Sequence, residues 1–132
     1  GTSTFSGVIS DGGLGGGLTV NGSGTETLSG ANTYTGLTTI GSGETLALSG
    51  TGSIAVSSGV SDSGTFSISG TTAAGASINS LSGSGGVTLG ARTLTLSAGA
   101  GAYSGVISGT GALTVNGNSS TDNTTRICRI SI

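Results

Sequence analysis

Few residues in this chain could carry out chemistry, and its five carboxylates are the first candidates. Glycoside hydrolysis needs two carboxylates held roughly 5–10 Å apart. The acids of this chain stand singly in separate segments, at Asp11, Glu26, Glu44, Asp62 and Asp122. This spacing predicts no catalytic pair, although the stacking of distant segments could bring two acids together by accident.

The residues for nucleophilic, metal and nucleotide chemistry are also missing. The chain has no His, no Lys and a single Cys, Cys128, which excludes zinc ligation and Ser-His or Cys-His pairs. Asp11 precedes a Gly-rich run instead of following a Gly pair in repeated calcium-binding turns, so it predicts a turn. Arg92, the one arginine of the repetitive region, is expected to be solvated. We therefore expect no catalytic, cofactor-binding or metal-binding residue, and a protein that is not an enzyme.

The charge balance narrows the range of partners. Charged residues make up 6% of the 132 residues, and the formal net charge is −2. Three arginines form no basic patch of the kind that phosphate contacts require, so nucleic-acid binding is not expected. No run approaches the roughly 18 apolar residues of a membrane helix, so we expect no transmembrane segment. The chain does not begin with Met, and we interpret it as a segment of a longer, processed protein.

Short apolar pairs spaced i, i+2 recur along the chain, and this period is typical of strands with one buried face. Gly- and Ser-rich corners separate the pairs, and no i, i+3, i+4 stripe indicates a helix. Aromatic residues make up only 3%, which disfavours a sandwich and favours a thin stacked coil. We predict an all-β, right-handed parallel β-helix of about 5–6 short coils. The pairs are Leu18/Val20, Leu46/Leu48, Ile54/Val56, Phe66/Ile68, Val87/Leu89, Leu94/Leu96 and Leu113/Val115.

One phrase of the sequence occurs twice. Residues 5–10 and 103–108 share the pattern aromatic-Ser-Gly-Val-Ile-Ser, and Leu-Thr-Val-Asn-Gly follows each, at residues 18–22 and 113–117. Such duplication indicates a repeat array, in which each unit buries its core against the next. We expect the two copies to open successive units. We also expect the aromatic residues to plug the core or its corners, at Phe5, Tyr34, Phe66 and Tyr103.

Residues 22–50 contain the most distinctive pattern. Residues 28–36 read Leu-Ser-Gly-Ala-Asn-Thr-Tyr-Thr-Gly, and a Thr-Thr-Ile strand and a Thr-Leu-Ala-Leu strand follow. This order resembles the passenger-associated β-strand repeat of bacterial autotransporters, over about residues 3–118. The resemblance implies a β-helical stalk that is displayed on, or released from, the outer membrane of Gram-negative bacteria. It also implies export and anchoring by a C-terminal barrel of the parent protein.

Three features depart from that repeat. Glu26 stands where the repeat places an inward aliphatic residue, and an unpaired buried carboxylate is costly. We therefore expect Glu26 to face solvent through a bulge or to lie near an open end. Glu44 adds one residue to the turn before Thr45. The C-terminal tail has no counterpart in the repeat. We therefore divide the chain into a repeat segment, residues 1–120, and a divergent terminus, residues 121–132. Within this terminus we expect a strand at residues 126–132 that caps the fold or pairs with a partner.

The sequence thus predicts a non-catalytic structural segment of a secreted or surface-displayed adhesin, which binds a host or bacterial surface ligand or self-associates through open coil ends or edge strands. The alternative is a subunit of a self-assembling extracellular fibre. An enzyme acting on polysaccharides would need converging acids. An ice-binding surface would need an outward Thr-x-Thr in every coil, and only Thr25/Thr27 and Thr93/Thr95 provide one.

Overall fold

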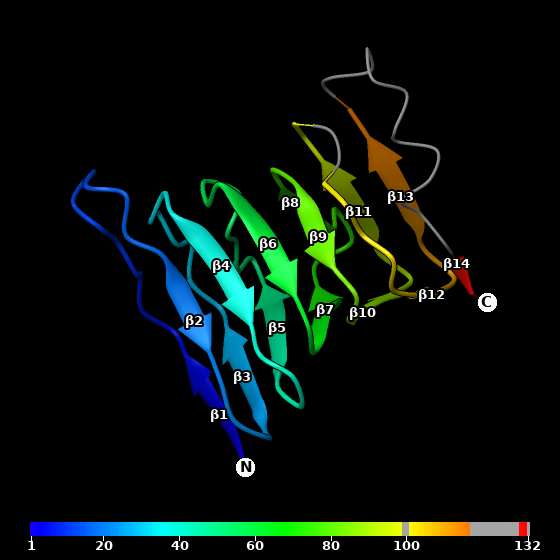
Figure 1. Ribbon diagram of the computed structural model, residues 1–132, viewed down its shortest axis with the longest axis horizontal. Helices are drawn as coiled ribbons and strands as arrows, with labels where there is room; N and C mark the ends of the chain where they lie inside the picture. Colours follow the sequence, from blue (N-terminus) through cyan, green and yellow to red (C-terminus); the bar gives the residue numbers. More distant parts are fainter. Residues whose placement is uncertain (99–100, 117–129, 132) are drawn as a thin grey trace.

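The structure is a computed structural model that describes residues 1–98 and 101–116 and, as strand backbone, residues 130–131. Every regular element in these ranges is a β-strand, and the strands follow one another along the long axis of the molecule (Figure 1). None of the described residues belongs to a helix that could cross a membrane. The strands are β1 (Thr2–Phe5), β2 (Leu18–Val20), β3 (Thr25–Leu28), β4 (Leu37–Ile40), β5 (Thr45–Gly50), β6 (Gly59–Asp62), β7 (Thr65–Thr71), β8 (Ala76–Ile78), β9 (Leu81–Gly83), β10 (Gly86–Gly90), β11 (Thr93–Leu96), β12 (Ile107–Gly109), β13 (Ala112–Val115) and β14 (Ile130–Ser131).

The strands form three sheets. The long sheet holds seven strands in the order β1-β3-β5-β7-β10-β12-β14, a four-stranded sheet runs β2-β4-β6-β9, and a three-stranded sheet runs β13-β11-β8. Each pairing is parallel and joins strands of successive coils. The chain is therefore a β-solenoid of about six turns, which confirms the all-β parallel solenoid predicted from the sequence.

The period-2 pattern decides which side chains enter the core. In β5, Leu46 and Leu48 are buried, while Thr45 and Ala47 are partly exposed. Partners in a parallel ladder point to the same side of the sheet, so the inward residues form columns along the solenoid axis. One such column of the long sheet comprises Glu26, Leu46, Phe66, Val87 and Ile107.

One predicted strand is a turn instead. Ile54 is buried, but Val56 is 48% exposed, and the Ser57 N–H donates to the Ile54 carbonyl to close the turn. The Ser57 hydroxyl also bonds locally to the Gly59 carbonyl, which favours a turn over a ladder. The other six apolar pairs lie in β2, β5, β7, β10, β11 and β13.

The two copies of the duplicated phrase occupy different places in the stack, so the repeated sequence does not occupy a repeated position. Phe5 ends β1 in the long sheet and pairs with Leu28, whereas Tyr103 bridges to Gly83 beside the four-stranded sheet. Phe5 is 43% exposed and so is not the core plug we expected, while Tyr103 is 4% exposed. The strands that follow the two copies differ in the same way, since β2 joins the four-stranded sheet and β13 joins the three-stranded one.

Part of the predicted C-terminal tail falls outside the described residues. These include the domain boundary at residue 120, Asp122 and Cys128. Within the tail, β14 pairs in parallel with β12, with Ile130 opposite Ile107, and continues the long sheet.

Candidate functional site

Asn32 lies at the centre of the distinctive run and joins three coils. Its side chain is 3% exposed. Its Oδ1 accepts a hydrogen bond from the Ile9 N–H of the preceding coil at 2.8 Å. Its Nδ2 donates to the Gly30 carbonyl and, in the following coil, to the Ser53 carbonyl, both at 3.1 Å. The amide is therefore fully engaged in holding coils together, where strand hydrogen bonds are interrupted by a corner.

Tyr34 begins a second buried polar network two residues later. Its hydroxyl lies 2.7 Å from Thr38 Oγ1, which lies 2.8 Å from Ser57 Oγ. Ser57 Oγ in turn donates to the Gly36 carbonyl at 2.7 Å, so the hydroxyl protons point in one direction along this chain. All three side chains are buried. Burial also raises the pKa of the Tyr34 phenol, so the phenol stays a neutral donor.

The glycines of the run also have a structural reason. A Cβ at Gly30 would collide with the Gly7 carbonyl oxygen, so the close approach of the first two coils requires glycine there. The side chains of Leu28, Asn32 and Tyr34 are all buried on the inner side of this coil. The pattern that the sequence analysis found most distinctive is thus the set of side chains on one face of one coil.

Asp11 organises the loop between β1 and β2. Its carboxylate accepts hydrogen bonds from Gly13 N–H at 2.8 Å and Gly15 N–H at 3.1 Å, and from Thr35 N–H at 2.8 Å and Thr35 Oγ1 at 2.6 Å. The Thr35 hydroxyl, followed by the backbone donors, holds the pKa of Asp11 well below its usual value. The predicted turn is confirmed, and its carboxylate is occupied by donors from the chain.

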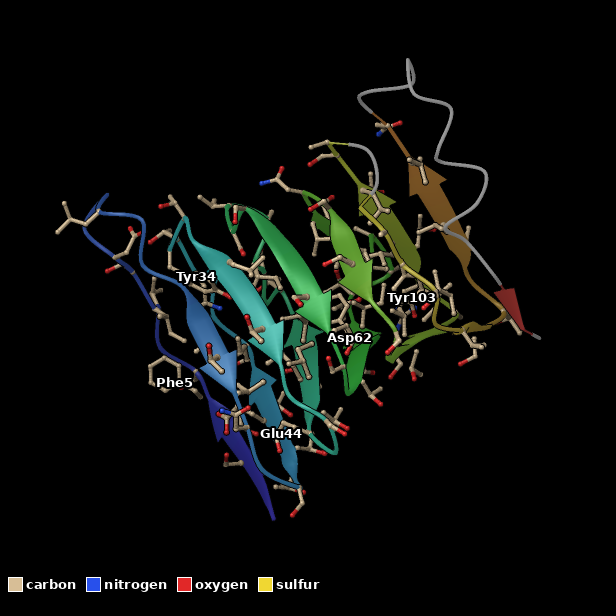
Figure 2. The ribbon with its side chains drawn as sticks, in the orientation of Figure 1. Phe5, Tyr34, Glu44, Asp62 and Tyr103 are labelled. Atoms are coloured by element: carbon tan, nitrogen blue, oxygen red, sulfur yellow. The ribbon has the colours of Figure 1, made fainter. Side chains whose placement is uncertain are left out.

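Glu26 and Glu44 are the two acids that the fold brings to a common pocket. Glu26 pairs in an unshifted ladder with Ser3 and Leu46, so it does not leave the sheet through a bulge, and β3 is the second strand of the long sheet. Its carboxylate accepts a hydrogen bond from the Ser3 hydroxyl. Glu44, labelled in Figure 2, is 7% exposed, and its carboxylate accepts a hydrogen bond from Gly24 N–H at 2.8 Å. The pocket has a volume of about 380 Å³ and is lined by Phe5, Ile9, Leu18, Thr19, Val20, Asn21, Glu26, Leu28 and Glu44.

Asp62 and Tyr103 form a buried pair that the sequence analysis did not single out. Asp62 is 0% exposed, its Oδ1 accepts from Gly64 N–H at 3.0 Å, and its Oδ2 has no hydrogen-bond partner. Tyr103 lies beside it (Figure 2), and the Tyr103 hydroxyl donates to the Gly85 carbonyl at 2.6 Å. The i, i+2 spacing of Val60 and Asp62 was the available signal, because it places the acid on the inner face of a strand.

The outer face of the long sheet carries hydroxyl residues in register. One column comprises Thr2, Thr25, Thr45 and Thr65 and ends at Gly86. The neighbouring column comprises Thr4, Thr27, Ala47, Ser67, Thr88 and Ser108. The Thr-x-Thr pattern is therefore continuous over the first two coils and is interrupted at Ala47, so it stays short of the regular array that ice binding would need.

The remaining predicted residues are accounted for as follows. Phe66 is buried, as expected of a core plug. Arg92 is partly exposed, and its Nε donates to the Thr71 carbonyl at 2.8 Å, so the side chain is held against the stack while it still contacts solvent. Among the residues that the structure describes, no three metal-ligating side chains lie together. No known protein family, curated protein or solved structure matches this chain.

Proposed function

We propose that this chain is a non-catalytic structural segment of a secreted or surface-displayed protein, similar to the passenger stalks of autotransporters. The observation that carries the proposal is the use of the polar groups in the distinctive run. The Asn32 amide and the hydroxyls of Tyr34, Thr38 and Ser57 are buried and bonded from coil to coil. Side chains used in this way stabilise the stack and are unavailable to a ligand.

The dimensions suit a role in projecting or spacing other parts of a protein. Coils stacked at the usual strand separation of about 4.8 Å give a rod roughly 25–30 Å long for about six turns. The repeat can be lengthened without changing its cross-section, because each coil contacts only its neighbours. An extracellular location at the bacterial surface follows from the resemblance of residues 22–50 to the passenger repeat.

The second candidate is a subunit of an extracellular fibre. The outer face of the long sheet supports it, because the Thr and Ser columns carry no charge that would oppose close packing of two copies. The net charge of −2 on 132 residues adds little long-range repulsion.

Electron microscopy of the purified chain over a range of concentrations separates the two candidates. Discrete short rods at every concentration support the stalk segment, and filaments that lengthen with concentration support the fibre. Turnover of a panel of polysaccharides, lost in the Glu26→Gln and Glu44→Gln variants, would overturn the non-catalytic proposal. If both variants keep whatever turnover the parent chain shows, the two acids of the pocket are not its source.

A further inference from the structure

Asp62 interrupts an otherwise apolar column of the core. In the ladder of the four-stranded sheet, Val20, Ile40, Asp62 and Gly83 occupy one register position in successive coils. Val20 and Ile40 are buried, and Asp62 is fully buried above them. Gly83 supplies no side chain over the carboxylate, and the ring of Tyr103 from the next turn lies beside it.

The surroundings of Asp62 provide one hydrogen bond where an ionised carboxylate needs several. Gly64 N–H binds Oδ1, and Oδ2 has no donor. The Tyr103 hydroxyl donates to the Gly85 carbonyl and so is not a partner of Oδ2. An ionised carboxylate with one oxygen unpaired is costly in the interior, whereas a neutral carboxylic acid is much less so.

The junction is also closely packed. A Cβ at Gly85 would lie 2.6 Å from Asp62 Oδ1, so the next coil has no space for a side chain beside the carboxyl group. The segments packed against Asp62 come from β4, β9, the Gly64 and Gly85 corners and the Tyr103 bridge. Among the described residues of these segments, Tyr103 contributes the titratable group, and Ile40 and the glycines contribute none.

We propose that Asp62 makes the junction between β6, residues 83–85 and Tyr103 a pH-sensitive contact, closed when the carboxyl is protonated and opened locally when it ionises. This inference goes beyond the structural role proposed above, and either could fail without the other. It assigns to this coil junction a contact that weakens when its buried acid ionises.

The direction of the response follows from burial. Burial raises the pKa of Asp62 from 3.8 to about 6, and the Gly64 hydrogen bond opposes this only in part. A raised pKa in the closed form means that closure is favoured in acid and is progressively lost as the pH rises from about 4 through 6. The opening equilibrium should therefore increase roughly fifty-fold between pH 4 and pH 8.

Hydrogen exchange of the full chain tests the proposal. The reporting amides are those of Gly83, Ser84, Gly85 and Ser104. The Ser84 and Gly85 amides donate to the Asp62 carbonyl, the Gly83 amide donates to the Ala102 carbonyl, and the Ser104 amide donates to the Gly83 carbonyl. After correction for intrinsic exchange rates, their protection should fall roughly fifty-fold between pH 4 and pH 8. The amides of Asn32, Thr33 and Ser53, at a junction without a buried acid, serve as internal controls and should change little.

The Asp62→Asn variant is the matched control, because it keeps the shape of the side chain and cannot ionise. It should show the same protection at both pH values, close to that of the parent chain in acid. Unchanged protection in the parent chain, or an equal pH response in Asp62→Asn, would overturn the proposal. If the variant does not fold, the carboxyl carbon shift of Asp62 in the parent chain decides, and a titration midpoint at or below 4 would refute it.

Discussion

Tyr34 and Thr38 lie on opposite sides of a corner of the second coil, and their hydroxyl oxygens are 2.7 Å apart inside the core. This hydrogen bond links the corner to β4 and gives the buried hydroxyls of Tyr34 and Thr38 a partner. Ser57 extends it to the third coil, so one tyrosine hydroxyl begins a network that spans two coils. The aromatic residue of the distinctive run therefore has two separable roles, filling space and donating one hydrogen bond.

Replacing Tyr34 separates these roles. Tyr34→Phe removes the hydroxyl but leaves Thr38 bonded to Ser57, and it should lower the free energy of unfolding by about 1 kcal/mol. Tyr34→Ala also empties the ring site in the core and should cost about 3–5 kcal/mol. Urea unfolding of the three proteins measures both changes. Equal losses in the two variants would show that the hydroxyl, and not the ring, dominates.

Asn32 should be the most sensitive polar position. Asn32→Ala leaves the Ile9 N–H and the Ser53 carbonyl without the side-chain partners that cross between coils. We expect a loss of about 2–3 kcal/mol in the free energy of unfolding, since several buried bonds are removed together. Asn21→Ala provides the control, because Asn21 is exposed, and should change stability by less than about 0.5 kcal/mol. Similar losses in both variants would contradict the role of Asn32 in joining coils.

The general architecture could be predicted because it depends on period and corner composition. The pairs Leu46/Leu48 and Phe66/Ile68 are buried, and their two-residue spacing and the Gly-rich corners between them are visible in the sequence. The location of each strand in the stack could not be predicted in the same way. The Phe5 and Tyr103 phrases are nearly identical, yet they lie against different sheets, and so do the strands β2 and β13 that follow them.

The buried polar groups were harder to foresee, because their partners come from other coils. Asn32 is paired with Ile9 and Ser53, which are about twenty residues away in either direction, and the sequence contains no local sign of those contacts. Asp62 is a similar case. Its alternation with Val60 indicates an inward position, but the absence of a partner for Oδ2 depends on where Tyr103 and Gly85 stack above it.

Asp11 should stabilise its loop in a pH-dependent way. Its pKa is lowered in the folded chain by the Thr35 hydroxyl first and by backbone donors in addition. The stabilising contribution is therefore fully present above the ordinary aspartate pKa of about 4 and is lost as the pH falls below it. The melting temperature of the parent chain should exceed that of Asp11→Asn at neutral pH, and the gap should narrow in acid. Leu14→Ser, a change at an exposed position of the same loop, is the control, and its melting temperature should stay close to that of the parent chain at every pH.

Glu26 should be a position where the natural residue is less stable than an apolar one. Its side chain shares a column with Leu46 and Phe66, and it is half-buried at the pocket that also contains Glu44. Glu26→Leu extends the apolar column and removes a partly desolvated carboxylate, so we expect a gain of about 1 kcal/mol in the free energy of unfolding. Glu26→Gln removes only the charge and should give a smaller gain. Urea unfolding at neutral pH compares the three proteins, and destabilisation by Glu26→Leu would show that the Ser3 hydrogen bond outweighs apolar burial at this position.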